Sequence, residues 1–141
     1  MAAIPYTRYE FAAYPFPVFA NIAVAGNQQQ TLQIASDADF EIMQIAQHTM
    51  IAYAAYTQNT RPVPNYLIQL ADSTNKYIFG NNQPIPLTAV CGQADQMPYF
   101  LPQSYILKAS ATLNCTLYNI DAAVATYDVY ITLVGRKCYL N

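Results

Sequence analysis

Charged side chains are the scarcest feature of this sequence. Only 6 Lys and Arg and 8 Asp and Glu occur among the 141 residues, which is 10%, whereas soluble domains usually carry about 25%. The net charge of -2 provides no basic field that would attract nucleic acid or an anionic lipid surface. We therefore expect neither a nucleic-acid partner nor a membrane partner.

The residues on which most catalytic and metal sites depend are also scarce. His48 is the single histidine, so a zinc or iron centre of the cupin kind, which takes several His or carboxylate ligands, is not expected. The 4 glycines form no phosphate-binding loop and no elbow beside a nucleophilic cysteine. We predict no enzyme activity and no cofactor.

Long apolar runs are missing as well. No stretch reaches the ~20 apolar residues of a membrane helix, and residues 1–10 lack the basic start and apolar segment of a signal peptide. Cys91, Cys115 and Cys138 cannot all pair with one another, and without an export signal we expect reduced, structural thiols.

Apolar and uncharged polar residues take the place of the missing charged residues. Hydrophobic residues are 54% of the chain, with 13 Tyr and 6 Phe, while Gln and Asn together number 22. Such a composition argues against intrinsic disorder, and the length predicts one domain with a substantial core. Amides, hydroxyls and tyrosines must supply much of the polar surface.

Short segments rich in Tyr, Val, Ile, Thr and Phe lie between closely spaced prolines, a pattern typical of strands. We predict strands at residues 18–25, 31–34, 40–53, 66–71, 76–79, 87–91 and 105–109. Residues 43–56 also fit a helix, but we favour a long strand with a bulge. Many short strands without crossover helices predict an all-β, antiparallel β-sandwich, and about eight or nine strands over this length fit a jelly roll.

The clearest alternation of apolar and polar residues lies in residues 111–119 and 124–139, which predicts two strands with one inward face. Joined through a turn at residues 121–123, they predict a hairpin with these opposite pairs: Leu113 and Ile131, Cys115 and Val129, Leu117 and Tyr127. In that register Cys138 lies about 30 Å from Cys115, beyond the reach of a disulfide.

Residues 1–17 differ from the rest because aromatic residues crowd together with prolines. We predict an extended N-terminal arm at residues 1–17 and a sandwich domain at residues 18–141. The aromatic spacing fits neither one helix face nor a clean strand, and rings exposed alone would form an apolar patch of the kind that marks interfaces. The arm packs either on a neighbouring subunit or back on its own sandwich.

Asp37, Asp39 and Glu41 alternate along the chain, so their carboxylates share one face of an extended segment. Several oxygen ligands on one face form a candidate cation site. The alternative, which we favour, is a turn followed by the solvent side of a strand, with Phe40 and Ile42 facing inward.

Several short stretches span much of residues 35–139: 36–42, 61–64 leading into 66–72, Gly92 followed by 98–102, 107–113, 117–119 and 131–137. In this order they resemble small structural proteins of tailed bacteriophage virions, of the head-stabilising or neck and tail accessory kind with a jelly-roll fold. The resemblance implies a capsid cement or decoration protein that binds neighbouring major capsid subunits in the virion as a dimer or trimer, and that is made in the host cytoplasm. It implies contact residues in the arm and in the loop at 95–102: Tyr6, Tyr9, Phe11, Tyr14, Phe16, Tyr99 and Phe100.

Two other functions fit the same sequence. One is a neck, collar or tail-associated structural protein of a phage. The other is a carbohydrate-binding jelly roll, because Tyr, Asn, Gln and Asp also suit sugars. For a subunit buried in contacts, we expect the uncharged surface to lie where neighbours touch and the few charges to lie elsewhere.

Overall fold

A computed structural model describes residues 6–22, 26–51, 66–72, 78, 83–91, 100–120 and 127–140. The strands in this part of the chain are β1 (Tyr6–Pro15), β2 (Phe19–Ile22), β3 (Asn27–Gln33), β4 (Asp39–Ile51), β5 (Tyr66–Asp72), β6 (Ile85–Pro86), β7 (Phe100–Leu107), β8 (Thr112–Asn119) and β9 (Tyr127–Leu140). One helical turn, α1 (Thr88–Cys91), interrupts them. Within these residues, no helix has the length and apolar character that crossing a membrane requires.

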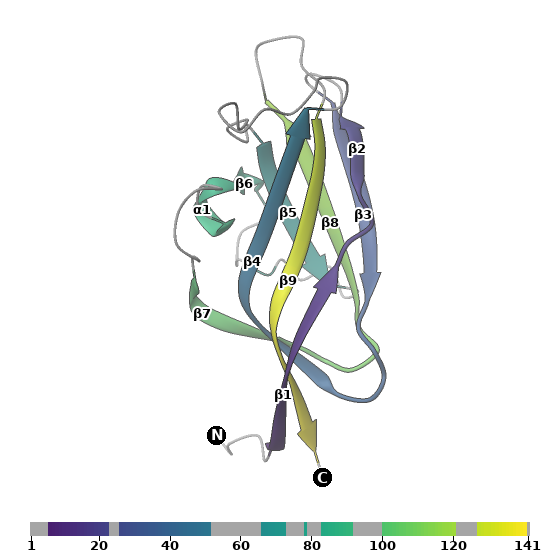
Figure 1. Cartoon of the computed structure of the whole chain (residues 1–141), viewed down its shortest axis with the longest axis vertical. Coiled ribbons are helices and arrows are strands. Elements are labelled where there is room, and N and C mark those ends of the chain that lie inside the picture. The colour runs from purple at the N-terminus through teal and green to yellow at the C-terminus, as the bar shows by residue number, and fades with distance from the viewer. Residues whose placement is uncertain are drawn as a thin grey trace.

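The strands form two antiparallel sheets. The larger sheet has the order β1-β9-β4-β7, with β2 also paired to β9, and the smaller sheet has the order β3-β8-β5-β6. Figure 1 shows β4 and β9 in front of β5 and β8, so the two sheets lie face to face. This arrangement confirms the predicted all-β, antiparallel β-sandwich, whereas the jelly-roll connectivity stays a prediction.

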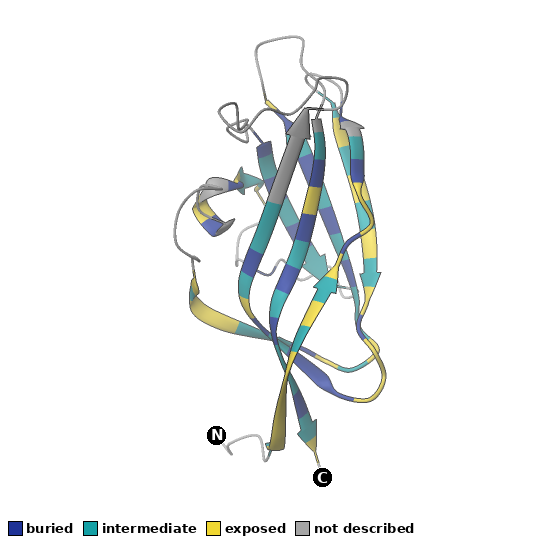
Figure 2. Ribbon diagram, in the orientation of Figure 1, coloured by how far each residue is buried: buried dark blue, intermediate teal, exposed yellow. Residues whose placement is uncertain are grey.

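The predicted hairpin between residues 111–119 and 124–139 is wrong, because β8 and β9 lie in different sheets. The predicted inward face is nevertheless correct, since its apolar residues are buried in one core: Leu113, Cys115, Leu117, Val129, Ile131 and Leu133. Figure 2 shows the alternation of buried and less buried residues along β9. An alternating pattern specifies which face is buried, but two such faces can also pack across a sandwich.

The long strand predicted from residue 40 onward is confirmed as β4, which continues to Ile51. Its register against both β9 and β7 shifts between Ile42 and Gln44, so Met43 is the extra residue of a bulge. Residues 52–56, the end of the same prediction, lie outside the described residues.

Residues 87–91 were predicted as a strand, and this prediction is wrong because the segment forms α1. Leu87 and Val90 are both buried, and a spacing of three residues between inward side chains suits a helical turn and not a strand. The strands predicted at 31–34 and 105–109 begin earlier, at Asn27 and Phe100.

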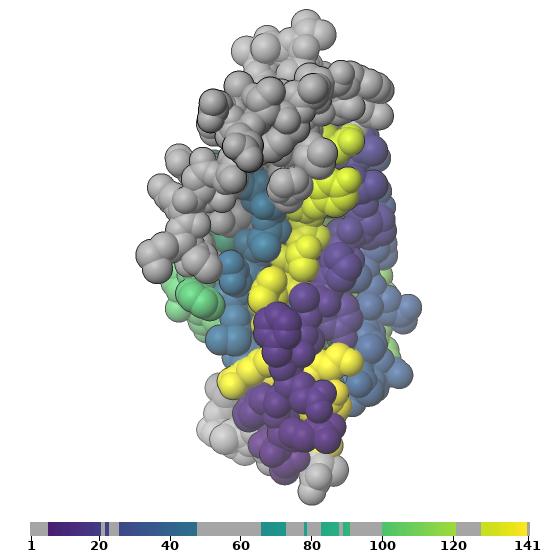
Figure 3. All heavy atoms as spheres, viewed as in Figure 1, coloured from purple at the N-terminus to yellow at the C-terminus, as the bar shows by residue number. Residues whose placement is uncertain are grey.

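The segment predicted as a separate arm is the edge strand of its own larger sheet. Residues 6–15 form β1 and pair with β9 from Tyr6 opposite Leu140 to Pro15 opposite Thr132. Figure 3 shows the atoms of β1 as a purple band beside the yellow atoms of β9. Of the two arrangements left open by the sequence, packing on the chain's own sandwich is the one observed.

Candidate interaction surfaces

Three of the aromatic residues predicted as contacts pack fully or partly against other parts of the same chain. Phe16 is 4% exposed and belongs to the core, where its ring lies 6.3 Å from that of Phe19. Tyr14 is half-buried, with its ring edge-on to Phe40 at 4.7 Å. Tyr6 is half-buried as well. Phe16 is therefore removed from the candidate contact surface.

The other described contact candidates point outward from the larger sheet. Phe11 in β1 is 80% exposed and Phe100 in β7 is 62% exposed. Strand register places Phe11 beside Arg136 and Phe100 beside Gln44, on the face opposite the core. Tyr9, on the same face as Phe11, is 47% exposed. Tyr99 lies outside the described residues.

The charged residues gather at one end of the sandwich. Of the ten charged residues in the described part of the chain, eight lie where β1, β4 and β9 meet the turns before β4 and before β8: Arg8, Glu10, Asp37, Asp39, Glu41, Lys108, Arg136 and Lys137. We call this group the charged end. Its four acids and four bases balance, and they form four ion pairs.

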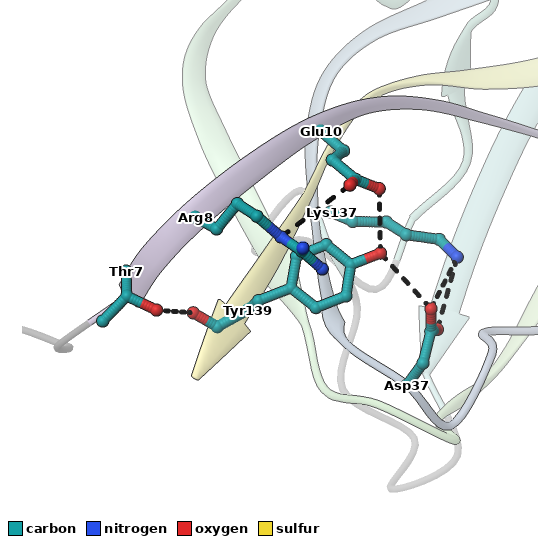
Figure 4. A network of polar contacts seen from close by, with 6 residues as sticks. All are labelled: Thr7, Arg8, Glu10, Asp37, Lys137 and Tyr139. Atoms are coloured by element: carbon teal, nitrogen blue, oxygen red, sulfur yellow. Dashed lines mark hydrogen bonds and ion pairs between the residues drawn. The ribbon is translucent and has the colours of Figure 1, made fainter. Parts of the chain in front are cut away.

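One side of the charged end is a network around Tyr139 (Figure 4). The single proton of the Tyr139 hydroxyl is shared between Glu10 Oε2 at 3.1 Å and Asp37 Oδ2 at 3.4 Å. The Arg8 guanidinium lies 4.2 Å from the ring centroid. Lys137 Nζ donates to both oxygens of Asp37, at 3.0 and 3.3 Å. Hydrogen bonding by Lys137 holds the pKa of Asp37 below its ordinary value.

On the other side, Asp39 is an 8% exposed carboxylate at the start of β4. It accepts hydrogen bonds from the Tyr6 hydroxyl at 2.7 Å and from the backbone N–H of Ala109 at 2.9 Å, and Lys108 Nζ lies 3.6 Å away. Burial alone would raise the pKa of Asp39, but these three partners hold it below its ordinary value. Asp39 thus connects β1 to the turn before β8.

Glu41 is the second carboxylate on this side. Ser104 Oγ donates to its Oε2 at 2.6 Å, and Arg136 Nε donates to its Oε1 at 2.5 Å. These two donors hold the pKa of Glu41 below its ordinary value. The Arg136 guanidinium also lies 4.0 Å from the ring centroid of Tyr9, so β7, β4, β9 and β1 are linked in a row.

The structure separates the three carboxylates proposed as a cation site. Asp37 lies in the turn before β4, whereas Asp39 and Glu41 follow in the strand, and each accepts hydrogen bonds from different donors. A depression of about 200 Å³ beside Asp37 and Asp39 is also lined by Cys138 and Leu140. Within the described ranges, no group of three or more His, Cys, Asp or Glu side chains is arranged to hold a metal ion.

The structure describes the side chains of two of the three cysteines, Cys115 and Cys138, and both are free and buried. Cys115 faces the core from β8, and Cys138 lies in β9 opposite Asp39. Burial raises the pKa of the Cys138 thiol, which lowers its reactivity as a nucleophile. The expectation of reduced, structural thiols is confirmed for these two residues.

The outer face of the smaller sheet carries no charged residue among the positions that the structure describes. Alternate residues of its three long strands form this face: Asn27, Gln29, Thr31 and Gln33 of β3, Thr112, Asn114, Thr116 and Tyr118 of β8, and Leu67, Gln69 and Ala71 of β5. We call it the amide face. Thr31 Oγ1 donates to Asn114 Oδ1 at 2.9 Å, and the Tyr118 hydroxyl donates to Gln69 Oε1 at 3.3 Å.

The amide face was not predicted from the sequence. The alternating residues of β8 were recognised, but the strand predicted at 31–34 left out residues 27–30, which belong to β3. Hydrophobic alternation identifies a strand poorly when both faces are polar, and only Leu32 in β3 is apolar. A uniform run of Gln and Thr without Gly, Pro or charge was the signal that could have found it.

Comparison of the sequence with models of protein families found no family that matches. Comparison with curated proteins found no match either.

Proposed function

We propose that the protein is a structural subunit of a virion, specifically a capsid cement or decoration protein that binds and stabilises neighbouring major capsid subunits. Support comes from the amide face and from the resemblance of residues 35–139 to small virion structural proteins of tailed phages. The amide face is the stronger support, because it is a broad surface whose uncharged polar groups suit burial against protein.

Uncharged amides and hydroxyls lose less solvation energy than charges when a partner covers them, and they can still form hydrogen bonds there. The cores of protein interfaces are accordingly depleted in charged residues. Among the described residues, eight of the ten charges lie at the charged end, where they form ion pairs with one another. The amide face is thereby left free of charge, as expected for a contact surface.

The larger sheet supplies a second set of contact groups. Phe11 and Phe100 are the most exposed large apolar residues of the described chain, at 80% and 62%. Large aromatic rings are typical anchors of protein contacts, because each buries much apolar area with few rotatable bonds. A cement protein that touches two neighbouring subunits needs contact groups on more than one face, and the two sheets supply them.

The test is binding of the purified protein to expanded shells that lack it, followed by electron microscopy. We expect added density on the outer shell and a higher melting temperature of the shell. A T116K variant, which places a charge in the middle of the amide face, should lose binding. A K108A variant, changed in a 73% exposed side chain of the charged end, should keep it.

Failure of the wild-type protein to bind shells, together with its occurrence as a free protein in infected cells, would overturn the proposal. Density at the neck or tail in place of the shell would favour the alternative of a neck, collar or tail-associated protein.

The carbohydrate-binding alternative requires exposed aromatic rings beside the polar groups. In the described residues, Phe11 and Phe100 lie on the larger sheet and the amide face lies on the smaller one. The most exposed rings thus lie on the sheet opposite the amide face, whose described aromatic residue, Tyr118, is half-buried and bonded to Gln69. We therefore give this function second place. Binding to immobilised glycans that is lost in T116K, without binding to shells, would reverse that order.

A further inference from the structure

Among the described residues, strand β3 forms an edge of the smaller sheet with no strand hydrogen-bonded to its outer side, although β2 of the larger sheet lies close to it. In Figure 1 it lies at the side of the sandwich, and in the order β3-β8-β5-β6 no described strand pairs with its outer edge. Exposed edges present unpaired backbone groups that can recruit another strand, so proteins usually protect them with charges, prolines, bulges or short length.

Every other edge strand in the described residues has such protection. β1 carries Arg8 and Glu10, and its register is irregular after Tyr6. β7 contains Pro102, and β6 has only two residues, of which Pro86 is one. β2 has four residues and an irregular register. In contrast, β3 has seven residues, a continuous register against β8, and no charge, proline or bulge.

The backbone of β3 shows which of its groups are available. Ile34 N–H donates to Ala111 O at 2.8 Å, and Asn119 N–H donates to Gly26 O at 2.9 Å. Because backbone groups of an antiparallel strand alternate between its two edges, the even-numbered residues of β3 bond to β8. The odd-numbered residues Asn27, Gln29, Thr31 and Gln33 therefore direct their N–H and C=O groups toward the free edge.

The sequence of β3 is suited to pairing with itself. In an antiparallel pair about a two-fold axis at Gln30, the edge-directed residues match as Asn27 with Gln33 and Gln29 with Thr31. Each pair can exchange two N–H···O=C bonds. The matched side chains are amides and a hydroxyl on the amide face, so no like charges meet. Thr31 already forms a cross-strand hydrogen bond of this type to Asn114, and its hydroxyl oxygen can still accept another.

We propose that two copies of this chain associate through β3, antiparallel and about a two-fold axis at Gln30. The smaller sheets of both copies then form one continuous sheet, and the two amide faces become a single charge-free surface. An isologous contact of this kind closes after two subunits. The pairing does not depend on the proposed virion role, because self-association and shell binding are measured separately.

The first test compares three proteins by light scattering after size-exclusion chromatography. Wild type should have twice the mass of one chain. T31P removes an edge-directed N–H without taking a backbone hydrogen bond from β8. It also removes the side-chain bond from Thr31 to Asn114, and it should be a folded monomer by circular dichroism. T116K changes β8, a central strand of the same amide face, and leaves the outer edge of β3 unchanged. It should therefore remain a dimer.

A second test checks the register and does not rely on proline. Q29K/T31K places like charges opposite each other in the proposed pair, and Q29E/T31E does the same with the opposite sign. Each variant alone should be a monomer, and an equimolar mixture should form a heterodimer because Lys and Glu then face each other. Amide hydrogen exchange of the edge-directed residues Gln29 and Gln33 should be slower in the wild-type dimer than in the monomeric T31P variant.

A monomeric wild-type protein across the soluble concentration range would overturn the proposal. A dimer that persists in T31P but is lost in T116K would also overturn it, because association would then occur through the face and not the edge. Failure of the two charged variants to combine would contradict the register about Gln30.

Discussion

The backbone of Gly135 in β9 lies directly against the carbonyl group of Glu41 in β4. A Cβ atom at Gly135 would overlap the Glu41 oxygen and lie 2.9 Å from its carbonyl carbon. The contact occurs beside the Met43 bulge, where the register of β4 shifts. Glycine is required at position 135 because the two central strands of the larger sheet approach each other too closely there for any side chain.

The G135A variant should therefore be severely destabilised. The added methyl group collides with backbone, which cannot move away without breaking the β4–β9 pairing. We expect the free energy of unfolding to fall by about 3 kcal/mol or more, measured by urea denaturation. V134A, one residue away, should have a much smaller effect, and equal losses in the two variants would contradict the steric explanation.

Acid should destabilise the protein through Asp39. Since its partners hold the pKa of Asp39 in the folded protein below the unfolded value of about 3.9, the carboxylate stabilises the fold above that pH. This contribution is lost as the pH falls through the folded pKa. D39N should lower the free energy of unfolding at pH 7 by about 2 kcal/mol and should weaken its dependence on pH below 4.

The matched control for D39N is Y6F, which removes one hydrogen bond to the carboxylate and leaves the charge. Its pH dependence should lie between those of wild type and D39N. Identical acid profiles for wild type and D39N would show that Asp39 does not control acid stability.

Gln28 and Gln30 lie two residues apart on the same face of β3, so variants of the two can be compared directly. The buried Oε1 of Gln28 has no hydrogen-bond donor among the described residues, whereas Gln30 Nε2 donates to Val18 O at 3.0 Å. Q28M should leave the free energy of unfolding unchanged or raise it by about 1 kcal/mol, and Q30M should lower it by about 1 kcal/mol. Urea denaturation measures both, and a loss in Q28M as large as that in Q30M would contradict this assignment.

Ser110 adopts a left-handed backbone conformation, with φ of 66°. The turn before β8 holds it there, with Ala111 N–H donating to Lys108 O at 3.0 Å and Ser110 N–H donating to Ala35 O at 3.3 Å. S110G should be at least as stable as wild type, while S110V should lose about 1–2 kcal/mol, since β-branched residues are strained at positive φ. Thermal denaturation ranks the three proteins, and a stable S110V would contradict the prediction.

The sequence was informative about which residues are buried and less so about which strands are neighbours. Leu113 and Val129 both lie in the core as their alternation predicted, yet their strands belong to different sheets. Strand order depends on long-range contacts, for which a local pattern contains no information. Residues 6–15 illustrate the same limit, because their pairing with β9 is determined by a segment more than 100 residues away.

The kinds of residue on the candidate surfaces could be predicted from the sequence, but the positions of these surfaces in the fold could not. Among the described residues, eight of the ten charged side chains lie together at the charged end, away from the amide face. Asp37, Asp39 and Glu41 were recognised as a group, but their partners Lys108, Arg136 and Lys137 come from distant segments. Phe16 was predicted as a contact residue, but it is buried. Its burial depends on the packing of β2 beside it, which the local sequence does not reveal.

The position of β9 has a consequence for the order in which the protein can fold during synthesis. β9 is the shared partner of β1, β2 and β4, and Thr7 in β1 and Tyr139 in β9 are 132 residues apart in the chain. The ribosome therefore releases β3, β5 and β8 before the strand that organises the larger sheet exists. The smaller sheet can assemble first. Its apolar side must wait for β9, and so must β1 and the side of β4 that does not pair with β7.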